Sequence, residues 1–198
     1  ASLPRVVSHM WMVTEGVFGI ALGVSVSFIF VYVLFGTLLD RATLMGDEHA
    51  VAERSADDLA AILYTSGTTG RSKGAMLTHG NLASNALTLK DYWGWTGGDV
   101  LIHTLPIFHV HGLFVALHCA ILNASEVIFL PGFDAATLRA QLPRATVLMG
   151  VPTFYSRLLA EPDFGAAECA NVRLFISGSA PLTPNVFHEF TERTGHTI

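Results

Sequence analysis

The sequence predicts an α/β fold in which a mostly parallel β-sheet is flanked by helices. Short apolar runs of strand length alternate with helical segments through the second half of the chain. Apolar residues make up 51% of the 198 residues and charged residues only 14%, as expected when parallel strands are buried on both faces. A loop rich in glycine and hydroxyl residues follows the first apolar run, where α/β sheets bind ligands.

The elements are expected in regular alternation. The first strand covers 59–63 and is expected to be buried, a second short strand covers 75–77, and Asn81 is the predicted N-cap of a helix that runs to about Tyr92. Further strands are predicted at 100–104, 126–130, 146–149 and 173–177. Further helices are predicted at 112–121, at 134–142, from Pro152, and from Thr183-Pro184 to near Gly195.

The loop between Tyr64 and Gly74 has the composition of a phosphate-binding loop. It holds three glycines, five serine or threonine residues and Lys73. Glycines bring backbone N–H groups close to an anion, hydroxyls donate hydrogen bonds, and a lysine adds a mobile positive charge. Its spacing differs from that of a Walker A loop. A flexible linker is the alternative, but linkers rarely follow a buried strand and end in a placed lysine.

This loop resembles the signature loop of the adenylate-forming (AMP-binding) enzymes, which include acyl-CoA synthetases, luciferases and adenylation domains. The resemblance implies that the loop surrounds the β- and γ-phosphates of ATP while a carboxylate attacks the α-phosphorus. It also implies that the chain is part of the large N-terminal domain of such an enzyme. The ATP-binding residues would be Thr65, Ser66, Gly67, Thr68, Thr69, Gly70 and Lys73, with Lys73 also catalytic.

Two histidines, His109 and His111, follow a predicted strand and precede Gly112. They could recognise a carboxylate or its adenylate, or pack as ordinary loop residues. A zinc site is less favoured because no further ligand lies at a typical spacing. The segment is similar to the family's P-x-F-H-x-x-G segment, which borders the acyl-substrate pocket. The resemblance implies a catalytic and substrate-binding role for His109 and a substrate contact for His111.

Residues 151–155 are similar to the V-P-T-x-Y/F segment that shapes the acyl pocket in this family. Simple helix packing explains Phe154 and Tyr155 equally well. Arg157 could bind a second carboxylate of the substrate, but a surface role is the ordinary one for an arginine on a helix.

Small residues follow the last predicted strand and allow a flat ring to approach the backbone. Gly178, Ser179 and Ala180 lie in a stretch that resembles the family's adenine-contacting segment. An ordinary βα turn is the alternative, and the position after the signature loop favours adenine binding.

The N-terminal part is harder to assign. Gly16–Leu39 holds 24 residues without a charge, enough for a membrane-spanning helix. Residues 1–40 can be a membrane anchor, a strand pair or a segment from a rearranged reading frame. Residues 41–58 are expected to form a linker, and 59–198 a partial AMP-binding domain truncated at its C-terminus.

Net charge and cysteine usage limit the binding partners and the cellular compartment that the sequence favours. A net charge of −5 argues against a nucleic-acid surface. Cys119 and Cys169 lack metal-ligand spacing and are expected to be reduced thiols, as in the cytoplasm, although residues 16–39 could mediate membrane association.

The resemblance implies an acid–thiol ligase that uses ATP, Mg²⁺ and coenzyme A to activate a small carboxylic acid. The similarity is strongest to malonyl-CoA synthetases, over 57–80, 109–114 and 174–182. The family's magnesium-binding glutamate would lie beyond Ile198, so no metal ligand is predicted here and this chain alone is expected to be inactive. The alternative is a membrane-tethered nucleotide-binding module without ligase activity.

Overall fold

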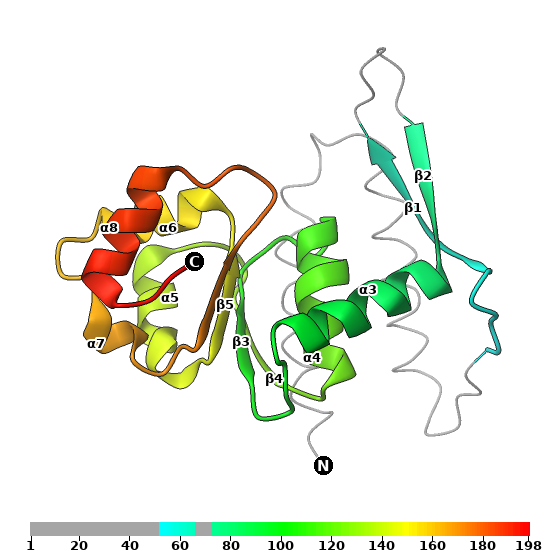
Figure 1. Cartoon of the computed structure of the whole chain (residues 1–198), viewed down its shortest axis with the longest axis horizontal. Coiled ribbons are helices and arrows are strands. Elements are labelled where there is room, and N and C mark those ends of the chain that lie inside the picture. Colours follow the sequence, from blue (N-terminus) through cyan, green and yellow to red (C-terminus); the bar gives the residue numbers. More distant parts are fainter. Residues whose placement is uncertain (1–51, 66–72) are drawn as a thin grey trace.

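The computed structural model describes residues 52–65 and 73–198 (Figure 1). Within them the chain forms a two-stranded hairpin and a four-stranded sheet, which lie on either side of helix α3. Helices cover both faces of the four-stranded sheet. The predicted α/β class is therefore confirmed.

Strands β1 (Leu59–Thr65) and β2 (Lys73–Thr78) form an antiparallel hairpin. The strand prediction for 59–63 is confirmed, but its burial is wrong. Leu59, Ile62 and Tyr64 are 46%, 43% and 63% exposed. The apolar composition favours a strand, but in the described part of the chain the hairpin stands apart from the four-stranded sheet and is not enclosed between two helix layers (Figure 1).

The N-cap of helix α3 (His79–Tyr92) lies three residues before the predicted cap, Asn81. Thr78 is the N-cap, and its hydroxyl accepts a hydrogen bond from the Asn81 backbone N–H at 3.2 Å. The Asn81 side chain accepts one from the Thr78 N–H at 3.0 Å. Asn81 is therefore the third helical residue of a capping box. The prediction was wrong because threonine and asparagine are both strong N-cap residues.

The prediction of a mostly parallel sheet is confirmed, and all strand pairings in the four-stranded sheet are parallel. This sheet consists of β3 (Val100–His103), β4 (Glu126–Phe129), β5 (Val147–Gly150) and β6 (Leu174–Ser177), in the order β4-β3-β5-β6. All four residues of the central strand β5 are buried. Because the strands are parallel, their carboxyl ends lie along one edge of the sheet.

Two helix layers enclose this sheet (Figure 1). On one face lie α3, the π-helix η2 (His111–Leu117) and α4 (His118–Leu122). On the other lie α5 (Ala135–Gln141), α6 (Pro152–Leu159) and α8 (Pro184–Thr194), with two short helices, η3 (Leu142–Arg144) and α7 (Ala166–Cys169). The predicted helix at 112–121 is thus a π-helix followed by a short α-helix. The N-cap roles of Asp134 and Thr183 are confirmed by position.

Aromatic residues fill the core under α6 and α8. Phe190 is fully buried, with its ring centroid 4.9 Å from that of Phe175 and 5.5 Å from that of Tyr155. The Tyr155 hydroxyl donates a 2.6 Å hydrogen bond to the Ile176 carbonyl. These contacts assign Tyr155 to core packing. Both cysteines are buried free thiols, as predicted.

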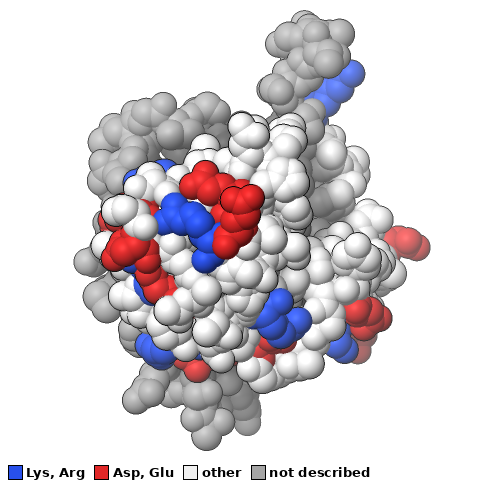
Figure 2. All heavy atoms as spheres, turned by 60° about the vertical axis from the view of Figure 1, so that its left-hand side comes forward, with Lys and Arg blue, Asp and Glu red and all other residues white. Residues whose placement is uncertain are grey.

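Opposite charges meet at the surface near α5 and α7. Arg139 pairs with Glu168 at 2.6 Å, with Asp163 at 3.1 Å and with Glu161 at 3.4 Å. Figure 2 shows basic and acidic side chains next to each other on one side of the molecule. Arg139 therefore links α5 to α7 and to the loop that follows α6.

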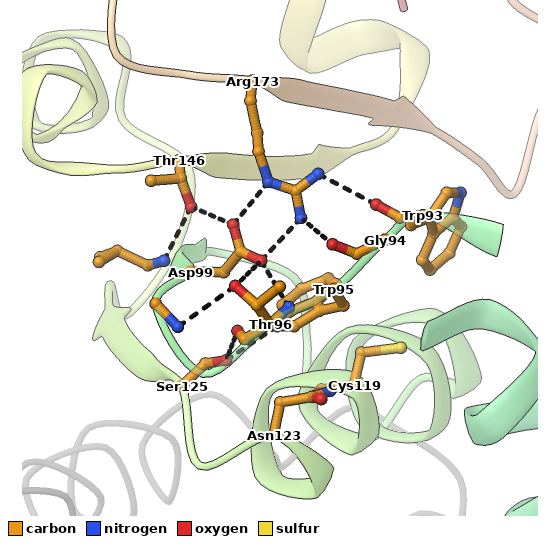
Figure 3. Close-up of polar contacts among 12 residues, drawn as sticks. Trp93, Gly94, Trp95, Thr96, Asp99, Cys119, Asn123, Ser125, Thr146 and Arg173 are labelled. Carbon is orange, nitrogen blue, oxygen red and sulfur yellow. Dashed lines mark hydrogen bonds and ion pairs between the residues drawn. The ribbon is translucent and has the colours of Figure 1, made fainter. Parts of the chain in front are cut away.

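An ion pair between the buried Asp99 and the more exposed Arg173 joins the amino ends of the parallel strands (Figure 3). Asp99, which is 3% exposed, accepts two 2.7 Å hydrogen bonds from Arg173 and one from Thr146 at the same distance. Arg173 also donates to the carbonyls of Trp93 and Gly94 at 3.0 and 3.1 Å. Because each of these residues lies just before a strand or after α3, the cluster sets the alignment of β3, β5 and β6.

Candidate functional site

The candidate site lies at the carboxyl edge of the parallel sheet, opposite the Asp99 cluster. The loop after β3 carries His109 and leads into η2, and the loop after β6 begins with Gly178. Open α/β sheets bind ligands at this edge. The structure thus brings two of the predicted segments to one place.

His111 joins these two loops. It is 6% exposed, and its Nδ1 lies 3.2 Å from the Ser179 hydroxyl oxygen. Its backbone N–H donates to Nδ1 of His109 at 3.2 Å. Whichever ring nitrogen carries the proton, one hydrogen bond links His111 to Ser179. His111 is therefore the residue that connects the predicted acyl and adenine segments, a more central place than the sequence indicated.

The exposed face of the site is small and polar. His109, Ser179 and Ala180 are exposed, whereas His111 lies beneath them. Ser179 has a φ of 67°, a left-handed conformation that is uncommon for a residue with a side chain. Such strain is often found at binding sites, where the surrounding structure holds it.

Two glycines allow the loops to approach. A Cβ at Gly178 would lie 2.8 Å from Cε1 of His111, and a Cβ at Gly112 would lie 2.3 Å from the Pro106 carbonyl oxygen. The imidazole and the loop turn can occupy these places only because both positions lack a side chain. The glycines of the two motifs thus have packing roles as well as turn roles.

Burial controls the charge of the histidine beneath the site. Loss of hydration, followed by the effect of His109, lowers the pKa of His111 below its usual value of 6.5. His111 is therefore neutral at pH 7 and has one donor and one acceptor nitrogen. A neutral imidazole can hydrogen-bond an anionic substrate without forming an ion pair.

His103, at the end of β3, was missed by the sequence analysis. It is 1% exposed, and its ring centroid lies 4.9 Å from that of Phe129. Burial, and to a smaller extent His111, lower its pKa to about 4. His103 belongs to an apolar strand and to none of the motifs. The only sequence signal for it is therefore that a polar residue stands in an otherwise apolar run.

The predicted phosphate loop is framed by the hairpin. Thr65 and Lys73 are cross-strand partners at its open end, and Lys73 is exposed. Ser66, Gly67, Thr68, Thr69 and Gly70 lie outside the described residues. In Figure 1, α3 lies between the hairpin and the parallel sheet that carries the histidines.

Arg157 lies on α6 with its guanidinium carbon 4.6 Å from the centroid of the Phe133 ring. Phe133 in turn stacks on Phe154 at 4.3 Å, and Phe154 packs where a side chain at Gly150 would lie. Arg157 is thus connected through two rings to the carboxyl end of β5. Phe133 is a further residue of this region that sequence reasoning missed.

Within residues 52–65 and 73–198, no group of three or more His, Cys, Asp or Glu side chains could hold a metal ion. In the same part of the chain, none of the helices is both long and apolar enough to cross a bilayer. Gly16–Leu39, on which the membrane interpretation depends, lies outside the described residues, as do residues 1–51 as a whole.

Comparison with known proteins gives consistent matches. Residues 22–198 match the family model described as AMP-binding enzyme. The chain is 41% identical over 174 residues to the mitochondrial malonate–CoA ligase ACSF3 of Mus musculus, covering 79% of this chain and 30% of that protein. The family match begins within the segment 1–40 that the sequence analysis left unassigned.

Solved structures agree. The ATP-bound crystal structure of MatB from Rhodopseudomonas palustris is 56% identical, with a TM-score of 0.75, over 81% of this chain and 32% of that one. A malonyl-CoA ligase with methylmalonyl-CoA and AMP bound is 39% identical, with a TM-score of 0.68, over 76% of this chain and 34% of that one. This chain thus spans about a third of the length of these relatives.

Proposed function

Because this chain belongs to the AMP-binding enzyme family, we propose that it is part of an ATP-dependent acid–thiol ligase that makes an acyl-CoA. The contact between His111 and Ser179 carries the proposal, since it joins the predicted acyl and adenine segments at 3.2 Å. The bound ATP, AMP and acyl-CoA of the two solved relatives support it.

The reaction would have two steps. A substrate carboxylate oxygen attacks the α-phosphorus of ATP, the bond to the β-phosphate breaks, and pyrophosphate leaves. The sulfur of coenzyme A then attacks the acyl carbon, and AMP leaves. Adenylation needs the two anions held in line, so binding geometry and positive charge are the main contributions of the protein.

The residues of this chain would hold the substrates. Lys73 would bind the leaving pyrophosphate, and the loop residues, Thr65 with Ser66, Gly67, Thr68, Thr69 and Gly70, would bind the phosphates through N–H and hydroxyl groups. Gly178, Ser179 and Ala180 would contact the adenine, because Ser179 and Ala180 are exposed at the carboxyl edge of the sheet. His109 would border the acyl group, with His111 behind it.

Mg²⁺ would neutralise phosphate charge when bound. The described residues offer no cluster of metal ligands, so none of the steps above is assigned to a metal held by them. The division into 1–40, 41–58 and 59–198 stays a prediction, as does a cytoplasmic location.

We further propose malonate or a similar dicarboxylate as the acid, with Arg157 as the ligand of its second carboxylate. The guanidinium carbon of Arg157 lies over the Phe133 ring, and this cation–π contact leaves its N–H groups able to bind a carboxylate. The malonate ligases among the relatives support this assignment.

Binding of Mg-ATP to this chain tests the nucleotide site. Lys73→Ala is expected to weaken binding about tenfold or more, because it removes a charge-assisted hydrogen bond. Lys90→Ala, on α3, removes an equal charge away from the loop and is the control. Equal affinity of the Lys73 variant and the wild type would contradict the proposed role.

Acid-dependent pyrophosphate exchange in the full-length protein tests the substrate. Arg157→Ala is expected to raise the KM for malonate by roughly ten- to a hundredfold and to leave the KM for acetate nearly unchanged. Arg144→Ala, which removes an exposed arginine paired with Glu126, is the control. A similar loss with both acids would exclude Arg157 as the second carboxylate ligand.

A further inference from the structure

A buried imidazole lies beneath the candidate site, and its two ring nitrogens lack well-formed hydrogen bonds. Among the described residues, no atom is in hydrogen-bond geometry with Nδ1 or Nε2 of His103, although the ring is 1% exposed. The Leu105 backbone makes a loose hydrogen-bonding contact with the ring that favours its protonation, but burial outweighs this contact and lowers the pKa. Because nearly all buried polar groups in proteins are hydrogen-bonded, this ring points to a bound partner.

The topology places this imidazole against the site. Leu101 of β3 packs in the cluster that includes Ala116 of η2. Side chains alternate along a strand, so His103 faces the same helix layer as Leu101. His111 is the first residue of η2 and acts electrostatically on His103. The two imidazoles therefore lie on one face of the sheet at its carboxyl edge.

We propose that His103 is a positioning residue for His111, which it holds through a water molecule hydrogen-bonded between the two rings. This inference rests on the proposed function, because His111 in turn holds Ser179. Two neutral imidazoles each offer a donor and an acceptor, and one internal water typically makes about three hydrogen bonds. Water is the smallest molecule that can form a hydrogen bond with both rings at once.

Packing alone gives no reason for a histidine here. Phenylalanine would fill the same space, would stack on Phe129 and would bury no polar atom. Unmet polar groups cost about 1–3 kcal/mol each, so a purely structural position would gain stability from that replacement. The neighbouring Thr104 also buries an unpaired hydroxyl, but by alternation it faces the opposite helix layer.

Four variants separate the two explanations. His103→Phe removes both nitrogens and keeps the ring, and His103→Asn and His103→Gln keep an amide nitrogen near Nδ1 or Nε2. Thr104→Val removes an unpaired hydroxyl from the other face and is the matched control. Urea unfolding and ¹H–¹⁵N spectra of the histidine rings are measured on this chain, and malonate-dependent pyrophosphate exchange on the full-length protein.

We expect His103→Phe to change the tautomer balance of the His111 ring and to lower kcat for exchange about tenfold, with the KM for malonate altered less than threefold, because misplaced groups slow the reaction more than they weaken binding. At least one amide variant should recover most of kcat. Thr104→Val should leave the His111 spectrum and kcat unchanged.

A His103→Phe protein that is more stable, with an unchanged His111 spectrum and full kcat, would overturn the inference. Failure of all His103 variants to fold would also overturn it if Thr104→Val folded, since the role would then be structural. An inactive wild type with a His111 spectrum that still depends on His103 would refute the proposed function and leave the positioning contact intact.

Discussion

Buried polar groups are hydrogen-bonded at the amino end of the parallel sheet and largely unpaired at its carboxyl end. At the amino end, Asp99 has a partner for each oxygen, and Arg173 binds two carbonyls besides (Figure 3). At the carboxyl end, the ring nitrogens of His103 and the hydroxyl of Ser177 are buried without a well-formed hydrogen bond among the described residues. The strained Ser179 and the π-helix lie at the carboxyl end as well.

This difference distinguishes polar groups that stabilise the fold from polar groups that are available to bind a ligand. A fully paired cluster fixes the strands and gains nothing from a ligand, whereas unmet hydrogen-bonding groups and strained backbone are costs that a bound ligand can offset. The amino end therefore stabilises the sheet, and the carboxyl end is adapted for binding.

The largest effect is expected at the amino end. Arg173→Met should lower the free energy of unfolding by about 3 kcal/mol, because it leaves the buried Asp99 carboxylate without its charge partner. Urea titration measures this loss. Arg144→Met breaks an exposed pair with Glu126 and should cost less than about 0.5 kcal/mol. Equal losses of stability in the two variants would mean that the Asp99 cluster does not stabilise the sheet.

A glycine variant tests the packing of the carboxyl end. Gly112→Ala should cost about 2 kcal/mol, because its Cβ would meet the Pro106 carbonyl oxygen at 2.3 Å. It should also displace His111 and reduce nucleotide binding. Gly132→Ala, with open space around its Cβ, should be neutral or slightly stabilising. Thermal unfolding of both variants checks the expectation, which fails if Gly112→Ala is tolerated.

The two ends should lose stability in different pH ranges. The pKa of His103 falls from 6.5 to about 4 on folding, so the unfolded chain binds more protons between these values. The free energy of unfolding therefore falls as the pH drops from about 6.5 to about 4. His111 and His118, whose pKa burial also lowers, add to this range.

At the amino end, burial alone would raise the pKa of Asp99, but hydrogen bonds, that from Arg173 first, lower it from 3.8 to about 2. Its contribution is present above about 3.8 and is lost as the pH falls toward 2. His103→Phe should flatten the upper range only, and Arg173→Met the lower range only. A His103 variant that keeps the wild-type slope above pH 4 would show that the ring is charged when folded.

The smallest effect concerns backbone strain. Ser179→Gly should raise the free energy of unfolding by up to about 1 kcal/mol, because glycine adopts a φ of 67° without strain. It should also weaken Mg-ATP binding, since the hydroxyl contact with His111 is lost. Ala124→Gly relieves a φ of 50° away from the site and should change stability without changing binding. If Ser179→Gly and Ala124→Gly changed Mg-ATP binding to the same extent, Ser179 would have no specific role in the site.

The sequence by itself determined what depends on local pattern. Strand-length apolar runs predicted the parallel strands, Asp134 predicted the start of α5, and the motifs around Lys73, His109 and Gly178 predicted the family. These signals are local because capping, turn geometry and close backbone approach each depend on a few neighbouring residues.

The tertiary structure decided whatever depends on residues distant in sequence. It showed that β1 is exposed, that Thr78 rather than Asn81 caps α3, and that His111 contacts Ser179, 68 residues further along the chain. It also revealed His103, a polar residue within an apolar strand. Burial and hydrogen bonding are properties of the assembled sheet, because parallel strands bring their carboxyl ends together only through long crossover connections.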